Sequence, residues 1–96
     1  MADWSFLTNH GRALVWIAGD SETRLRDIAA HLGITERRAY GIVSDLTKDG
    51  YLVKSKEGRR SRYQVQRKKS LPVFPGGAMS VGAVLDLLET SQSVDR

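Results

Sequence analysis

The side chains best suited to chemistry in this sequence are basic, and they fall into two groups. Arg37 and Arg38 stand beside Tyr40 in a segment with helical spacing. Eight further Lys/Arg residues fall within Lys54–Lys69, where Glu57 is the only acidic residue. Guanidinium and ammonium groups bind phosphate oxygens, and arginine also pairs with the edge of guanine. The chemistry expected here is therefore recognition of a polyanion, and nucleic acid is the expected partner.

Residue types that usually carry catalysis or bind metals are scarce. The sequence has no cysteine, and its two histidines, His10 and His31, are not accompanied by a histidine-rich cluster. No Ser/His/Asp arrangement, glycine-rich phosphate loop or paired-carboxylate motif is visible. We therefore expect no enzyme activity, no cofactor and no metal site. The lack of thiols also excludes a disulfide scaffold and a Cys-based zinc site.

The positive charge is concentrated in one part of a chain the size of a single domain. The 96 residues carry 15 Lys/Arg against 11 Asp/Glu, a net charge of +4, and 41% of them are hydrophobic, as in ordinary globular proteins. From Ser70 onward, Arg96 is opposed by three acidic residues. The longest apolar run, Ala13–Gly19, is far shorter than the ~20 residues that span a bilayer. We expect a cytoplasmic protein with no membrane partner.

Apolar spacing predicts two helices before residue 34. The first is expected over Trp4–Ala18, with Thr8 or Asn9 capping its main part. The second starts near Leu25–Asp27 and stops at Gly33, where a left-handed residue is favoured. Its apolar face recurs at i, i+3, i+4 and i+7, as expected of a short amphipathic helix packed on a core, and consists of Leu25, Ile28, Ala29 and Leu32.

A third helix is predicted from about Glu36 to Asp49. Thr35 is placed to cap it, and the carboxylate of Glu36 suits the positive end of the helix dipole. Gly50 ends it. Its buried face repeats the spacing of the second helix with Ala39, Ile42, Val43 and Leu46.

After Gly50 the pattern changes to that of strands. The runs Tyr51–Ser55 and Ser61–Val65 are rich in Val, Tyr and Leu and flank a charged loop containing Gly58, which predicts a β-hairpin. The segment Leu71–Gly77 holds both prolines and is expected to be a connector without regular structure. A last helix is predicted over Val81–Glu89. We accordingly divide the chain into a domain at 1–69, a linker at 70–79, and a helix with a frayed tail at 80–96.

These elements define an α+β, mostly α fold: a winged helix-turn-helix with a three-helix core, a two-stranded β-wing and an extra C-terminal helix. The sequence resembles bacterial winged helix-turn-helix transcriptional regulators of the MarR/ArsR type over roughly Thr8–Val65, and especially small actinobacterial regulators. The resemblance lies in the segments Arg24–Thr35, Asp45–Val53 and Gly58–Tyr63, together with Phe6–His10 and Val81–Leu88. It implies a regulator that binds double-stranded DNA in a sequence-specific way.

The third helix is expected to enter the major groove, because its apolar face is used by the core. The candidate DNA-binding residues on its other face are Thr35, Glu36, Arg37, Arg38, Tyr40, Gly41, Ser44 and Lys48. The wing is expected to contact the backbone or the minor groove through Lys54, Lys56, Arg59, Arg60 and Arg62. Arg67, Lys68 and Lys69 either extend this footprint or form a solvated strand end.

The last helix is too short to be stable alone, so its apolar face must dock. It either packs on its own domain or meets a second copy in a homodimer, which is the preferred interpretation, through Val81, Val84, Leu85 and Leu88. The aromatic residues Trp4, Phe6 and Trp16 are expected in the core. Two other functions stay open, a winged-helix protein-interaction module and a non-specific nucleic-acid binder, and the sequence does not indicate whether a small-molecule effector exists.

Overall fold

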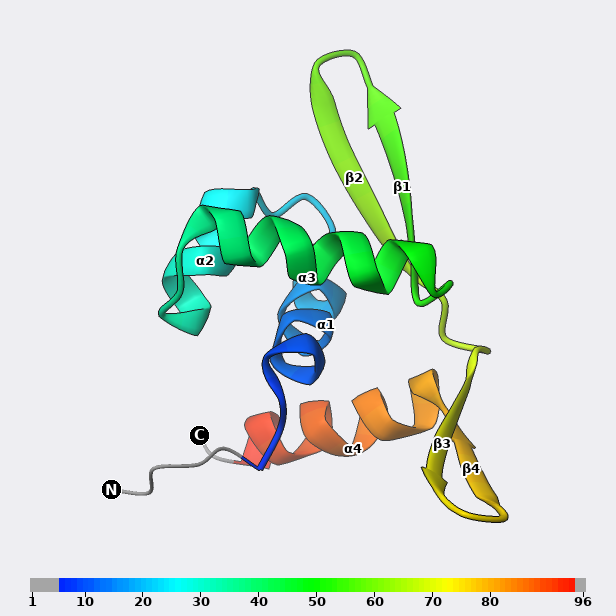
Figure 1. The fold of residues 1–96 in the computed structure, drawn as a ribbon. Coiled ribbons are helices and arrows are strands. Elements are labelled where there is room, and N and C mark those ends of the chain that lie inside the picture. Colours follow the sequence, from blue (N-terminus) through cyan, green and yellow to red (C-terminus); the bar gives the residue numbers. More distant parts are fainter. Residues whose placement is uncertain (1–5, 95–96) are drawn as a thin grey trace.

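The computed structural model describes residues 6–94 and has the predicted α+β architecture, with three helices, a wing and a C-terminal helix (Figure 1). For residues 73–74 and 89–94 it describes the backbone alone. Figure 1 shows the wing projecting from one side of the helices, while the C-terminal helix lies on the other side. The elements in chain order are α1 (Asn9–Gly19), α2 (Leu25–Leu32), α3 (Glu36–Lys48), β1 (Leu52–Glu57), β2 (Arg60–Val65), β3 (Ser70–Phe74), β4 (Gly77–Ser80) and α4 (Val81–Val94).

Local sequence sets the ends of the first three helices. The hydroxyl of Thr8 accepts a hydrogen bond from the backbone N–H of Gly11 at the start of α1, and Thr35 accepts from Arg38 at the start of α3, both at 3.1 Å. Gly33 ends α2 with φ 72° and ψ 36°, the left-handed conformation that glycine adopts most easily. The predicted caps are therefore confirmed, although α1 begins at Asn9 and not at Trp4, which lies outside the described residues.

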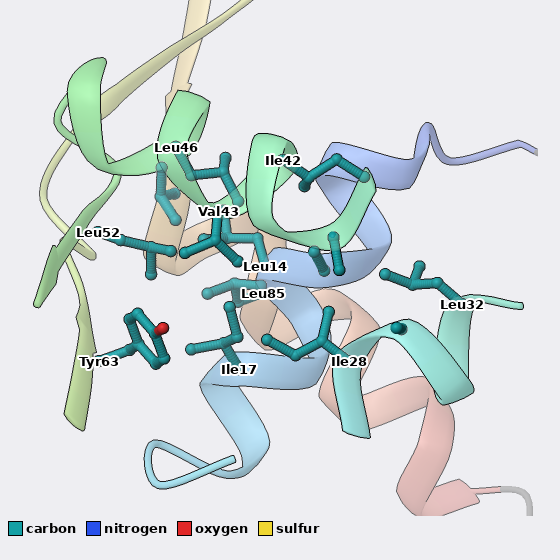
Figure 2. Close-up of a cluster of buried hydrophobic side chains, with 14 residues drawn as sticks. Leu14, Ile17, Ile28, Leu32, Ile42, Val43, Leu46, Leu52, Tyr63 and Leu85 are labelled. Atoms are coloured by element: carbon teal, nitrogen blue, oxygen red, sulfur yellow. The ribbon is translucent and has the colours of Figure 1, made fainter. Parts of the chain in front are cut away.

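One hydrophobic core joins all four helices to the base of the wing (Figure 2). Ile17 of α1 and Ile28 of α2 are completely buried at its centre, and Leu52 and Tyr63 close it from the wing strands. Figure 2 shows Leu85 of α4 pointing into the same cluster. The wing is thus anchored by buried residues at its base, while its tip extends into solvent.

Of the aromatic residues expected in the core, Trp16 packs against it and Phe6 does not. Trp16 packs against the core, stacks on the ring of His31 at 4.0 Å between centroids, and donates from Nε1 to the hydroxyl of Thr23 at 2.9 Å. Phe6, which was expected in the core, is 90% exposed, because it precedes α1 and nothing in the described chain covers it. The predicted burial of Phe6 is wrong.

The wing is longer and more tightly turned than predicted. Its strands pair in antiparallel register from Leu52 opposite Val65 to Glu57 opposite Arg60, which leaves only Gly58 and Arg59 in the loop. Gly58 has φ 64° and Arg59 has no positive φ, as in a type II′ hairpin turn. The paired strands carry charged side chains almost to the tip.

A second hairpin replaces the irregular connector that was predicted after residue 70. Strands β3 and β4 pair antiparallel from Ser70 opposite Ser80, with an irregularity between Pro72 and Phe74. An isolated two-stranded ribbon tolerates proline because the missing N–H can face outward. Pro75 followed by Gly76 at φ 82° suits the turn between the strands. The last helix also continues past Glu89, to Val94.

Candidate nucleic-acid interface

The outward face of α3 collects the residues that the sequence assigned to it. All eight predicted residues are exposed, and Tyr40 exposes 64% of its surface although it is large and aromatic. The opposite face of α3 is buried in the core and consists of Ala39, Ile42, Val43 and Leu46. Because burial fixes the rotation of the helix, the basic and polar side chains are held outward together.

A groove of about 980 Å³, here called the wing groove, separates α3 from the wing. Both elements contribute basic side chains to it: Lys48 comes from α3, and Lys54, Arg59 and Arg60 come from the wing. The loop between α1 and α2 forms the third side. The wing groove therefore brings together residues that are far apart in the sequence, and its lining also includes Glu22, Thr23, Arg24, Leu25, Tyr40, Val43, Ser44, Thr47, Ser61 and Tyr63.

The five predicted wing cations are all exposed, but two of them are paired with carboxylates. Arg60 Nη1 lies 2.9 Å from Glu22 Oε1, and Arg62 Nη2 lies 2.9 Å from Glu22 Oε2. Arg62 also reaches Glu57 at 3.5 Å. The cations Lys54, Lys56 and Arg59 complete the wing set. The wing thus carries arginines that are paired with carboxylates and basic residues for which no such pair is found among the described residues, and its sequence does not distinguish the two kinds.

The loop between α1 and α2 was missed as part of the site. Glu22 and Arg24 are exposed and line the wing groove, whereas Thr23 between them is buried. Arg24 occupies the position before the first residue of α2, and in a helix-turn-helix this helix crosses the nucleic-acid backbone. The position of Arg24 just before a predicted helix was the available signal. No local pattern indicated that Glu22 would meet the wing.

Two of the three basic residues after the wing, Arg67 and Lys69, contact other parts of the fold. The guanidinium of Arg67 donates to the carboxylate of Asp86 at 2.5 Å and to the carbonyl of Gly82 at 3.3 Å, both on α4. The ammonium of Lys69 lies over the ring of Tyr51, 5.5 Å from its centroid. These contacts hold the C-terminal segment against the domain.

The four residues proposed for dimerisation divide into two pairs. Val81 and Leu85 are 1% and 2% exposed because they pack into the core of their own chain. All four residues line a second pocket, of about 350 Å³, between α1, the end of α3 and α4, but Val84 and Leu88 are only half-buried. Val81 and Leu85 are therefore not available to a partner in this structure.

Among the side chains that the structure describes, no three His, Cys, Asp or Glu residues are grouped as metal ligands would be. His10 Nε2 donates to the carboxylate oxygen Oδ2 of Asp45 at 2.8 Å and so links α1 to α3. No helix between residues 6 and 94 is long and apolar enough to cross a membrane.

The chain is similar in sequence to a known repressor and in structure to MepR. A LexA repressor from Thermosipho melanesiensis is 34% identical over 65 residues, which cover 68% of this chain and 33% of that protein. The crystal structure of MepR, a transcription regulator of the Staphylococcus aureus multidrug efflux pump MepA, aligns with a TM-score of 0.57 at 16% identity, covering 93% of this chain and 64% of MepR. The chain thus spans about a third of the LexA repressor and less than two thirds of MepR. No protein-family model matches it.

The likeness to MepR concerns the fold. It extends over nearly the whole chain and agrees with the order of elements, in which three helices precede the two-stranded wing and a further helix follows. This protein therefore has a winged-helix fold.

Proposed function

We propose that this protein is a transcriptional regulator of the MarR/ArsR type that binds double-stranded DNA in a sequence-specific way. The observation that carries the proposal is the wing groove, where the outward face of α3 and the basic wing border one open channel. A channel lined by cations on two sides suits a phosphate backbone. The similarity to a protein named LexA repressor and to the regulator MepR supports the same function.

The N-terminal half of α3 would read the bases. In a helix-turn-helix the start of the second helix enters the major groove, and here it presents Arg37 and Arg38, both exposed. Arginine forms a bidentate pair with guanine, worth ~1–3 kcal/mol against a wrong base. The exposed ring of Tyr40 is placed to pack on a thymine methyl group or to reach a phosphate.

Gly41 lies at the centre of this face. A Cβ atom added there would meet nothing within 4 Å, so the fold itself does not require glycine. Its lack of a side chain would instead let the helix backbone approach the DNA. Ser44 and Lys48, one and two turns further along and lining the wing groove, would then contact phosphates.

The wing would position the protein and contribute little to sequence choice. Lys54, Lys56 and Arg59 are exposed along β1 and at the turn, where they would contact backbone phosphates or the flanking minor groove. Arg24, which also lines the wing groove, would add a contact from the helix-turn-helix itself. Such contacts strengthen binding to all sequences alike.

We further propose that two copies form a homodimer through the side of the molecule that carries α4. The pocket between α1 and α4 is lined mainly by apolar side chains, and Leu87, also on α4, is 66% exposed. A two-fold dimer would place two α3 helices for half-sites ~34–36 Å apart, so a palindromic site is expected.

The proposal is tested by fluorescence-anisotropy titration of a duplex from upstream of the protein's own gene. A scrambled duplex is measured beside it, at several salt concentrations. We expect a preference of ~10³ or more for the specific site, and the slope of log affinity against log salt counts the phosphates neutralised.

The other outcomes identify the rival functions. Equal, salt-sensitive binding to both duplexes, repeated with a pool of random sequences from which no site can be enriched, would show a non-specific binder. A lack of binding to every duplex at low salt would contradict DNA binding and favour a protein-interaction module.

A further inference from the structure

The pairing of Glu22 with two wing arginines is not explained by the folding of the domain. Both carboxylate oxygens of Glu22 are used, one by Arg60 and one by Arg62, each at 2.9 Å. The three side chains stay substantially exposed, at 44% for Glu22, 69% for Arg60 and 46% for Arg62. Exposed ion pairs stabilise a fold very little. The more informative feature is their position, because Glu22 and Arg60 line the wing groove and Glu22 connects Arg62 to it.

The loop that carries Glu22 is fixed from both sides. The backbone N–H of Glu22 donates to the carboxylate of Asp20 at 3.2 Å, and the N–H of Tyr63 on β2 donates to the carbonyl of Ser21 at 2.9 Å. On the other side, the hydroxyl of buried Thr23 accepts from Trp16. These contacts hold the backbone of Glu22 at the edge of the wing.

A carboxylate bound by two arginines presents the same chemistry as a backbone phosphate. Both are anions with oxygen acceptors that match the guanidinium fork. A phosphate entering the wing groove would therefore seek the donors that Glu22 already occupies. Because each exposed ion pair shifts an equilibrium by at most about fivefold, the exchange of one anion for the other is feasible.

We propose that Glu22 is an internal competitor for the nucleic-acid backbone, which occupies Arg60 and Arg62 until a phosphate displaces it. The inference rests on the proposed function, because it assumes that the wing groove receives a phosphate backbone. It assigns Glu22 the role of lowering affinity for all sequences equally, since phosphate contacts carry no sequence information. A regulator so restrained spends less time on non-specific DNA.

The test compares Glu22→Gln with Asp49→Asn. Asp49 is an exposed residue at the end of α3 that does not line the wing groove. Because both substitutions remove one carboxylate, they change the net charge equally. We expect Glu22→Gln to bind a scrambled duplex at least about threefold more tightly than wild type, with a salt slope steeper by about one to two units. Asp49→Asn should change affinity by less than about twofold, because the exposed Asp49 carboxylate is screened and is not paired with a wing arginine.

A third comparison separates competition from simple repulsion. In a background carrying Arg60→Gln and Arg62→Gln, Glu22→Gln should produce no more gain than Asp49→Asn. An equal gain in both backgrounds would show that Glu22 only repels the duplex, and weaker binding of Glu22→Gln than of wild type would show that Glu22 orients the arginines for binding. Either result overturns the proposal.

Elution from immobilised heparin distinguishes this inference from the proposed function. Heparin offers sulfate anions without base pairs, so Glu22→Gln should elute at higher salt than Asp49→Asn even if no duplex is bound. Failure of all duplexes with a retained heparin difference would contradict the function alone. Coincident elution of the two variants would contradict the competition itself.

Discussion

Arginines of the same basic segment have different tasks, and their neighbours decide which. Arg59 sits at the wing turn, Arg60 and Arg62 share the carboxylate of Glu22, and Arg67 is tied to α4. The sequence shows that the segment is basic, and it predicted that the tip of the wing would be exposed. It could not predict the pairing, because Glu22 is separated from Arg60 by 38 positions and meets it only after the wing folds back over the loop.

At the same scale, the burial of Tyr63 leads us to expect a loss of stability in alkaline solution. Burial raises the pKa of its phenol above the ordinary value of 10.0. The folded state therefore favours the protonated form, so this contribution is complete below about pH 10 and is lost as the pH rises through the folded pKa. We expect the free energy of unfolding to fall more steeply above about pH 10 in wild type than in Tyr63→Phe.

Urea unfolding at a series of pH values measures this difference. Tyr40→Phe is the matched control, because Tyr40 is 64% exposed and its variant should follow the wild-type curve. Parallel curves for wild type and Tyr63→Phe would contradict the role assigned to Tyr63.

At the scale of elements, the helices were predictable and the second hairpin was not. Apolar residues at i, i+3, i+4 and i+7 fixed α2 and α3 within one or two residues, and Thr35 and Gly33 marked their ends. Strands β3 and β4 lack such a period. Their prolines suggest a connector, and the pairing of Ser70 with Ser80 depends on α4 packing nearby, which a local pattern does not contain.

Two glycines on the helix-turn-helix should respond oppositely to alanine. Gly41 lies within α3 with open space around it, so Gly41→Ala should raise the free energy of unfolding by about 0.5–1 kcal/mol. Gly33 has φ 72°, so Gly33→Ala should lower it by about 1 kcal/mol. Chemical denaturation of both variants beside wild type measures the two changes. Stabilisation by Gly33→Ala would contradict the left-handed cap.

On the scale of the whole molecule, α4 belongs to the same core as the helix-turn-helix. Val81 and Leu85 are buried with Ile17 in one cluster, and Arg67, in the turn that follows β2, donates to Asp86 of α4. We therefore propose that the chain folds as one unit, in which the sequence-based boundaries at 69 and 80 mark a hairpin and not a flexible joint. The apolar face of α4 was predictable from its spacing. Which residues of that face stay exposed depends on how the β3–β4 hairpin orients α4 against the domain.

The proposed dimer should depend on Leu87 and not on Leu85. Leu87→Arg should convert a dimer to a monomer in sedimentation equilibrium, because it places a charge on the exposed apolar surface of α4. Val53→Arg, at a residue 48% exposed on the wing, is the control and should leave the dimer intact. Leu85→Ala should instead reduce the free energy of unfolding by ~2–5 kcal/mol. A monomeric wild type at high concentration would contradict the dimer.

The division of labour between α3 and the wing is the central claim, and one ratio tests it. The affinity for a selected duplex divided by that for its scrambled version is measured for wild type, for Arg37→Ala combined with Arg38→Ala, and for Arg59→Ala. We expect the α3 variant to lose at least about tenfold in this ratio, while Arg59→Ala weakens both affinities and reduces the salt slope by about one unit. A ratio that survives the α3 substitutions but falls with Arg59→Ala would contradict the account.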